Sequence, residues 1–188
     1  MPDSRHHDVA ARRYAAAVRE TPAEIENLQQ LLDDSDTNAG DHLRLIFGGA
    51  NRLPAGDLVA KLDGIIEVHL ATLTRDGSPL VAPIDAIFLH GKVFVSIAVT
   101  AVRSRLLRLD PRVSASYTDG SFAFIVHGRA IEIPEDSDAA REFLEVAREL
   151  YVALYGPGWL TFHEQRKRDQ GGPDWSGWIE PRAMFAKR

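Results

Sequence analysis

The sequence predicts a mainly β protein of the α+β class: a small antiparallel barrel of six short strands, with flanking helices and a helical extension before it. From Ile66 onward, apolar and polar residues alternate in short runs, which is the period of a strand with one buried face. Dipeptides that favour tight turns separate several of these runs, Asp76-Gly77 and Asp119-Gly120 among them, as is typical of antiparallel hairpins. Helical periodicity is concentrated before this region and in one later segment, 137–155.

The composition favours one globular domain with an extension. The 188 residues are 45% hydrophobic and 26% charged, which suits a single sizeable core. A net charge of -5 argues against broad nucleic-acid binding, which depends on clustered positive charge. The sequence has no cysteine, so disulfides, thiolate metal sites and cysteine nucleophiles are excluded. Without an apolar run of roughly 18 residues or a signal-like N-terminus, we expect a cytoplasmic protein with no membrane or nucleic-acid partner.

Residues 1–57 are predicted to form the helical extension, and residues 58–188 the barrel domain. An Ala-rich segment over 8–20 is the first expected helix. A second begins after Thr21, because Pro22 takes the first helical position and Glu24 stands three residues after the cap, the spacing of a capping box. Two short helices follow, one ended by glycines and one with apolar residues at helical spacing. These glycines and apolar residues are Gly48, Gly49, Leu58, Leu62 and Ile65.

The first hairpin runs from about residue 68 through the Asp76-Gly77 turn and into a return strand. One face of the return strand is wholly apolar, and the other carries Pro83 and Asp85. Because Pro83 cannot donate a ladder hydrogen bond, we expect the strand to be at an edge or bulged there, which leaves backbone groups free beside Asp85. The apolar face comprises Leu80, Ala82, Ile84, Ala86 and Phe88.

The rest of the chain is predicted to supply four more strands, a long helix and a polar loop. The strands are expected over 92–97, 112–118, 122–133 and 178–187. The amphipathic segment 137–155 predicts a helix that covers a face or an open end of the sheet. The polar, Gly-rich segment "EQRKRDQGGPDWSG" is expected to be a loop.

The segment "VTAVRSRLLRLDPR" carries the chemistry. A helix from about Ala101 would be capped by Thr100 and end before Pro111, which places Arg103 and Arg105 near its start. Cations there oppose the positive end of the helix dipole unless an anion lies between them, so the residues predict a phosphate site. An ordinary helix with its arginines on a solvated face explains the same residues. Both interpretations stay open at this point.

In this order, "HLATLTRDGSPLVAPI", "KVFVSIAVTAVRSRLLRLDPRVS", "FAFIVHGRAIEI" and "WIEPRAMFAK" resemble the pyridoxamine 5'-phosphate oxidase-like split-barrel family. The likeness covers about residues 58–187. It implies a six-stranded antiparallel split β-barrel and a homodimer with two cofactor sites at its interface. The implied cofactor is FMN or the deazaflavin coenzyme F-420.

The resemblance also implies candidate cofactor-binding residues. It lays the cofactor ring against strand backbone at Pro83, Ile84 and Asp85. It puts Arg103 where the family usually has a phosphate-binding lysine, and Arg105 lies two residues beyond. Trp178 is expected to cap the barrel core, whereas Trp175, nearer the polar loop, is expected to stack on a cofactor or substrate from the partner chain. The remaining candidates are Ser96 and Thr100.

The predicted function is a flavin- or deazaflavin-dependent oxidoreductase that transfers a hydride to or from a small organic substrate. Because the cofactor carries the chemistry, no catalytic side chain is assigned, and Asp85 is the acid to test. The alternative is a non-catalytic dimeric binding protein with a degenerate flavin site or a haem site. Apolar residues where FMN-binding members tend to have polar ones favour it: Ile97, Ala98, Ala101 and Val102. No metal site is assigned, since His6 and His7 lack a carboxylate at ligand spacing.

Overall fold

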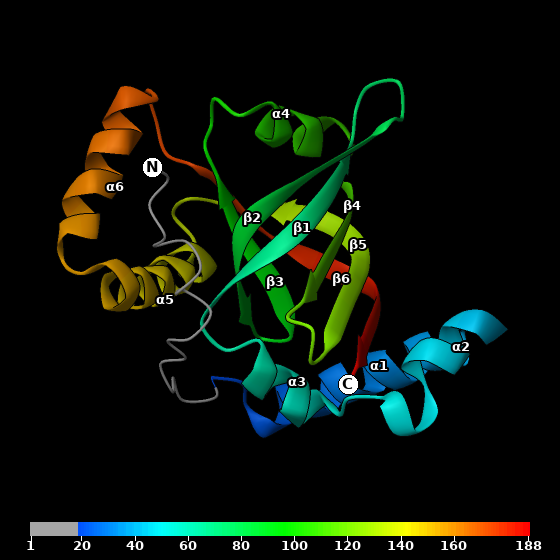
Figure 1. The fold of residues 1–188 in the computed structure, drawn as a ribbon. Coiled ribbons are helices and arrows are strands. Elements are labelled where there is room, and N and C mark those ends of the chain that lie inside the picture. Colours follow the sequence, from blue (N-terminus) through cyan, green and yellow to red (C-terminus); the bar gives the residue numbers. More distant parts are fainter. Residues whose placement is uncertain (1–18) are drawn as a thin grey trace, which may run out of the picture.

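The computed structural model describes residues 19–188. Six antiparallel strands close into a barrel in the order β1-β2-β3-β6-β5-β4 (Figure 1). The structure therefore confirms the predicted fold class, an antiparallel barrel with flanking helices. The strands are β1 (Ile65–Leu73), β2 (Pro79–Leu89), β3 (Lys92–Ile97), β4 (Arg112–Thr118), β5 (Ala123–Glu132) and β6 (Trp175–Lys187).

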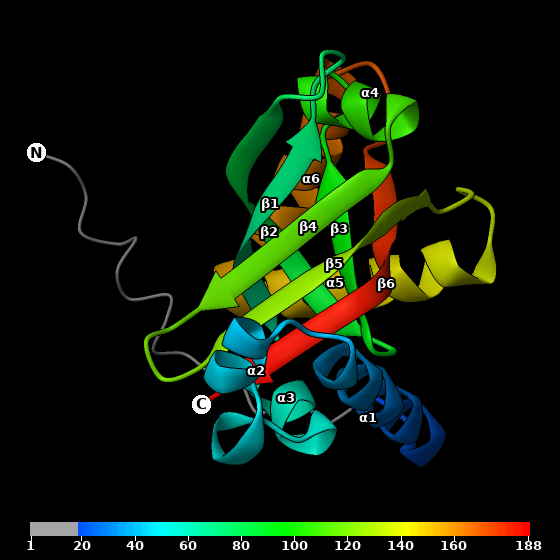
Figure 2. The same ribbon diagram turned by 90° about the vertical axis from the view of Figure 1, so that its right-hand side faces the viewer.

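Three α-helices and a 3-10 turn lie against one end of the barrel (Figures 1 and 2). The predicted capping box is present: the Thr21 hydroxyl accepts from the Glu24 amide, and the Glu24 carboxylate accepts from the Thr21 amide. Leu28 and Leu32 share one buried core with the barrel, so the extension packs directly onto it. These elements are α1 (Pro22–Thr37), α2 (Asp41–Phe47), η3 (Gly49–Asn51) and α3 (Ala55–Lys61).

The helix predicted over 8–20 lies almost entirely outside the described residues. Only Arg19 and Glu20 of that segment are described, and neither is helical. The predicted helix end at Gly48 is confirmed, because α2 stops at Phe47 and the Gly48 amide bonds the Arg44 carbonyl.

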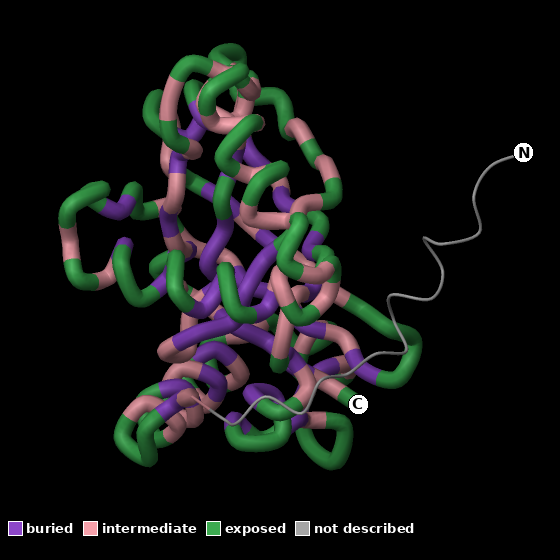
Figure 3. The backbone as a smooth tube through the Cα atoms, turned by 90° about the vertical axis from the view of Figure 1, so that its left-hand side faces the viewer, coloured by how far each residue is buried: buried purple, intermediate pink, exposed green. Residues whose placement is uncertain are grey.

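The barrel interior is filled by apolar side chains from the strands. Val68, Phe124, Val126 and Met184 have no exposed surface, and the buried stretches of the chain gather in the barrel (Figure 3). Such close packing of the interior fixes the strand positions on which the outer residues stand. Side chains that alternate outward from β2 and β3 are therefore available to a second layer.

The irregularity predicted at Pro83 is an edge and not a bulge between β1 and β2. Pro83 lies opposite His69 in an unbroken antiparallel register between β1 and β2. β3 pairs with β2 only from Ala86 onward, so the first half of β2 has a neighbour on one side alone. A proline is tolerated in such a position because its missing donor faces no partner strand.

Two helices cover the outer faces of β2 and β3 (Figure 1). α5 (Asp138–Tyr155) lies in the segment predicted to be helical, starts after the Ser137 cap, and buries a second core with outward residues of these strands. α6 (Gly158–Asp169) follows after a turn at Gly156. α4 (Val102–Leu109) lies at the end of the barrel opposite α1.

The prediction of a loop over "EQRKRDQGGPDWSG" is wrong at both ends, because residues 164–169 belong to α6 and residues 175–177 belong to β6. The helix has no buried residue, so it lacks the apolar stripe by which helices are recognised. Local interactions support it instead. Gln165 donates to Asp169 at 2.7 Å four residues on, and three cations in the last turn complement the helix dipole.

Candidate functional site

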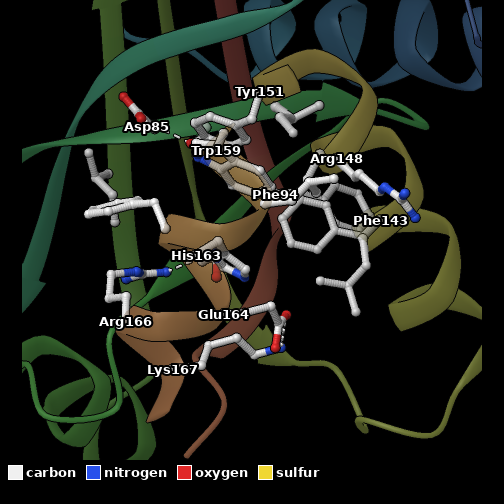
Figure 4. A pocket seen from close by; sticks show the side chains of 18 residues that line it. Asp85, Phe94, Phe143, Arg148, Tyr151, Trp159, His163, Glu164, Arg166 and Lys167 are labelled. Carbon is white, nitrogen blue, oxygen red and sulfur yellow. Dashed lines mark hydrogen bonds and ion pairs between the residues drawn. The ribbon is translucent and has the colours of Figure 1, made fainter. Parts of the chain in front are cut away.

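A cavity of about 650 Å³ lies between the outer faces of β2 and β3 and helices α5 and α6 (Figure 4). Its floor is formed by the strands, and its walls by the two helices. The lining residues are Ile84, Asp85, Ala86, Ile87, Phe94, Ser96, Phe143, Leu144, Ala147, Arg148, Tyr151, Trp159, Leu160, Phe162, His163, Glu164, Arg166 and Lys167.

One wall of the cavity is a stack of aromatic rings. The Trp159 ring is 4.7 Å from the Tyr151 ring and 4.7 Å from the His163 ring, and it is nearly parallel to both. Tyr155 continues the stack beyond Tyr151 at 6.1 Å. Residues four apart on a helix share a face. The two tyrosines therefore lie on one face of α5, and Trp159 and His163 lie on one face of α6. The turn at Gly156, where φ is 83°, brings the two pairs together.

Asp85 projects from the outward face of β2 toward this stack (Figure 4). The Tyr151 hydroxyl donates a hydrogen bond to the Asp85 carboxylate at 2.9 Å. Burial, together with the negative charge of Asp85, raises the pKa of Tyr151 well above its usual value. The phenol therefore stays protonated at any physiological pH and holds the carboxylate in place.

A polar corner stands at the other end of the stack. Arg166 is ion-paired with Asp174, whose side chain is 5% exposed and also accepts from Ser96 at 3.2 Å. Arg166 lies 3.2 Å from Nδ1 of His163. Because a guanidinium can only donate, Nδ1 accepts and the ring hydrogen is on Nε2.

The charge state of His163 follows from the same neighbours. Burial, and then the positive charge of Arg166, lowers the pKa of His163. The imidazole is therefore neutral at physiological pH and offers the cavity one N–H donor.

The start of α4 differs from the prediction at one point. Ala101, not Thr100, is the N-cap, and no side chain caps this end. The Ser104 hydroxyl bonds the Val99 and Ala101 carbonyls instead. Arg103 and Arg105 do lie in the first turn, and Nε of Arg103 is buried with no partner among the described residues. Burial lowers the pKa of Arg103.

Thr100 connects this region to the main cavity. It lines a neighbouring hollow of about 370 Å³ that shares Phe162 and Arg166 with the main cavity. A ligand longer than the main cavity could therefore extend along α6 toward the start of α4.

The structure brings some of the predicted site residues together and separates others. Ile84, Asp85 and Ser96 line the main cavity, and Thr100 lines the hollow beside it. Pro83 is on the same strand without lining the cavity. Neither Arg103 nor Arg105 lines either space.

Neither tryptophan lines the main cavity. Trp175 is 3% exposed and belongs to the barrel core, so its ring is not accessible for the expected stacking on a cofactor or substrate. Trp178 faces outward, where its ring packs 5.7 Å from Phe94 and its indole N–H donates to Glu180. Trp175 and Trp178 are three residues apart on β6, so the two side chains point to opposite faces of the strand. We therefore leave Trp175 out of the candidate site.

Sequence reasoning missed the aromatic wall. The four-residue spacing of Tyr151, Tyr155, Trp159 and His163 was a usable signal, but it is interrupted by Gly156 and Pro157. Only the fold shows that the two helices place their rings in one stack. In the described part of the chain, no group of three metal-ligating side chains is present, and no helix is long and apolar enough to cross a bilayer.

Comparison with known proteins supports the fold alone. No family model and no curated protein matches the chain. A conserved hypothetical protein from Mycobacterium tuberculosis superposes with a TM-score of 0.51 at 19% identity, over 65% of this chain and 76% of that one. A heme binding protein from Mycobacterium smegmatis gives 0.48 at 16% identity, over 66% and 49%. A FAD-binding protein from Mesorhizobium loti gives 0.45 at 17% identity, over 64% and 82%.

Proposed function

We propose that the chain binds a flavin-type cofactor, FMN or the deazaflavin coenzyme F-420, in the cavity between the strands β2 and β3 and the helices α5 and α6. The observation that carries the proposal is the cavity itself: it has an aromatic wall and it includes Ile84 and Asp85, the strand residues expected to lie along the cofactor ring. Its volume of about 650 Å³ is in the range of pockets that hold cofactor-sized ligands.

Several residues suit such a ligand. The β2 backbone near Ile84 has no partner strand on one side, so its polar groups are free to bond the edge of a ring. Trp159 offers an apolar surface, and neutral His163 offers one N–H donor. The phosphate end would extend toward Thr100 at the start of α4, and Arg103, which lines neither space in this structure, would have to turn toward the hollow to contact it.

We further propose that the protein is a cytoplasmic oxidoreductase, and that the cofactor supplies the acceptance and return of a hydride. The chain's own residues would bind and orient. Tyr151 holds the Asp85 side chain beside the ring site through its hydrogen bond. Arg166, fixed by Asp174, sets the tautomer of His163. None of these residues is required to exchange a proton during hydride transfer.

The second candidate is a non-catalytic binding protein with the same cavity. It is favoured by the side chains around the start of α4: Ile97 is buried in the core, and Ala98, Ala101 and Val102 carry no polar group. Fewer hydrogen bonds to a phosphate mean weaker retention of FMN.

The experiment that separates these functions has two stages. First, the absorbance spectrum of the purified protein is recorded before and during titration with each cofactor. A bound cofactor with a shifted spectrum supports the site. Next, the bound cofactor is reduced without oxygen and mixed with organic acceptors. Faster reoxidation than that of the free cofactor supports an oxidoreductase, whereas binding without acceleration supports the second candidate.

We also expect a homodimer, as the split-barrel resemblance implies. A groove of about 740 Å³ is lined by residues of β1, β4, β5 and β6 and by Pro79 at the start of β2. Among its lining residues, Ile131 is 37% exposed. A second copy of the chain would bury this surface.

A further inference from the structure

The cavity is larger on the α5 side than a ring on β2 would need. If the cofactor lies along β2 and extends toward Thr100, as proposed above, one part of the lining is left without a ligand. That part consists of residues from α5 and the strand positions behind them: Ile87, Phe94, Phe143, Leu144, Ala147 and Arg148.

The floor of this part is apolar. Phe94 and Phe143 are buried and pack with ring centres 5.3 Å apart, and Ile87 belongs to the same cluster. At the rim, Leu144 is 46% exposed and Phe162 on α6 is 65% exposed. An apolar ligand on this floor would cover Leu144 and Phe162 at the rim and gain the transfer of their exposed surface from water.

The rim also carries a positive charge that no residue of the described part of the chain neutralises. Arg148 has no ion-pair or hydrogen-bond partner among the described residues, whereas Arg141 on the same helix pairs with Asp138. The two other cations of the lining are engaged. Arg166 is paired with the buried Asp174, and Lys167 lies 3.5 Å from Glu164.

We propose that this α5 side of the cavity binds the substrate, and that the substrate is an apolar monocarboxylate. Its hydrocarbon part lies on Phe94 and Phe143, and its carboxylate meets the guanidinium of Arg148. One free guanidinium matches one carboxylate, since the two groups form a pair of parallel hydrogen bonds. The assignment of this ligand as substrate rests on the proposed cofactor site, but its binding to the α5 side does not.

The test uses three probes and two variants of the full chain. Octanoate has both features, octan-1-ol lacks the charge, and acetate lacks the hydrocarbon chain. Calorimetry measures their affinities for the wild type, for Arg148→Leu and for the control Arg141→Leu, which removes an arginine of the same helix outside the cavity. We expect octanoate to bind wild type about tenfold more tightly than either other probe, as one partly exposed charge-assisted contact allows.

The variants decide the role of Arg148. Arg148→Leu should weaken octanoate about tenfold and leave octan-1-ol unchanged, and Arg141→Leu should change neither. Equal affinities of octanoate and octan-1-ol for the wild type, or equal losses in the two variants, overturn the proposal.

Repeating the octanoate titration in saturating FMN separates this inference from the proposed function. Unchanged octanoate affinity supports two adjacent sites, and competition overturns the assignment as substrate. If neither FMN nor the deazaflavin coenzyme F-420 binds, the cofactor proposal fails, while the octanoate result still decides whether the α5 side takes an apolar carboxylate.

Discussion

His90 joins three parts of the structure in a way that should make stability depend on pH. It lies in the β2–β3 turn with a φ of 53°. Its Nδ1 is 2.6 Å from a Glu24 oxygen on α1, and its Nε2 is 2.9 Å from a Glu142 oxygen on α5. A ring that bonds a carboxylate through both nitrogens must carry two hydrogens, so the folded state favours the imidazolium.

The direction of the pKa shift gives the sign. Burial alone would lower the pKa of His90, but the hydrogen bonds and charges of Glu142 and Glu24 outweigh it and raise the pKa above its ordinary value. A raised folded-state pKa means that the stabilisation is complete below the unfolded value of about 6.5 and is lost as pH rises through the folded value. The buried Glu20 nearby, whose own pKa is raised mainly by burial, adds negative charge as pH rises.

The magnitude follows from exposure. The His90, Glu24 and Glu142 side chains are 30%, 28% and 53% exposed, and each such pair contributes about 0.2 to 1 kcal/mol, so the two together contribute about 1 kcal/mol. His90→Asn removes the charge and keeps a residue that tolerates positive φ. In urea unfolding, the free energy of unfolding of the wild type should exceed that of the variant by about 1 kcal/mol near pH 6, and by much less near pH 8.5.

Comparing the two proteins at each pH cancels the titration of groups that they share. A stability difference that is the same at both pH values would refute the reasoning, because it would mean that His90 acts through packing or turn geometry and not through its charge.

Three other predictions concern binding, packing and assembly. Arg103→Ala should weaken cofactor binding by roughly 1.5 to 3 kcal/mol, whereas Arg108→Ala, which removes an ion pair with Glu132, should not; fluorescence titration of both variants measures this, and equal effects would exclude a phosphate site at α4. Gly128→Ala should destabilise the fold by about 1 to 3 kcal/mol in urea unfolding, because the new methyl group would overlap the carbonyl of Glu180 beside the β5–β6 bulge. The control Gly56→Ala, in open space on α3, should instead stabilise the fold by roughly 0.5 to 1 kcal/mol. An unchanged stability of Gly128→Ala would contradict the packing. Sedimentation at micromolar concentration should find a dimer, and a stable monomer would contradict the predicted interface.

Local signals in the sequence predicted most of the fold. The Asp76-Gly77 and Asp119-Gly120 turns and the Thr21 capping box depend on residues a few positions apart, and all were recovered. The helix start at Thr100 was wrong although its residue type suits a cap. Ser104, three residues after Ala101, bonds the carbonyls there instead, and sequence alone does not rank such competing local bonds.

The site was predictable only in part. The family resemblance implied Ile84 and Asp85, and Ser96 on β3 was also a candidate, but Tyr151, the partner of Asp85, is 66 residues away in sequence. That pairing depends on how α5 crosses the barrel, which no local pattern encodes. The same limit applies to Trp175, whose burial follows from the register of β6 against β3.

The most direct test of the central claim is whether the aromatic wall holds the cofactor. FMN and the deazaflavin coenzyme are titrated into the wild type, Trp159→Leu and Tyr155→Leu, with cofactor fluorescence as the readout. Each substitution removes one ring from the same stack, Trp159 from within it and Tyr155 from its end, but Trp159 lines the cavity and Tyr155 does not. The account predicts that Trp159→Leu weakens binding by about 1 kcal/mol or more, the scale of a ring-stacking contact, and that Tyr155→Leu leaves it unchanged. Tight binding that is unaffected by Trp159→Leu would place the cofactor elsewhere and contradict the account.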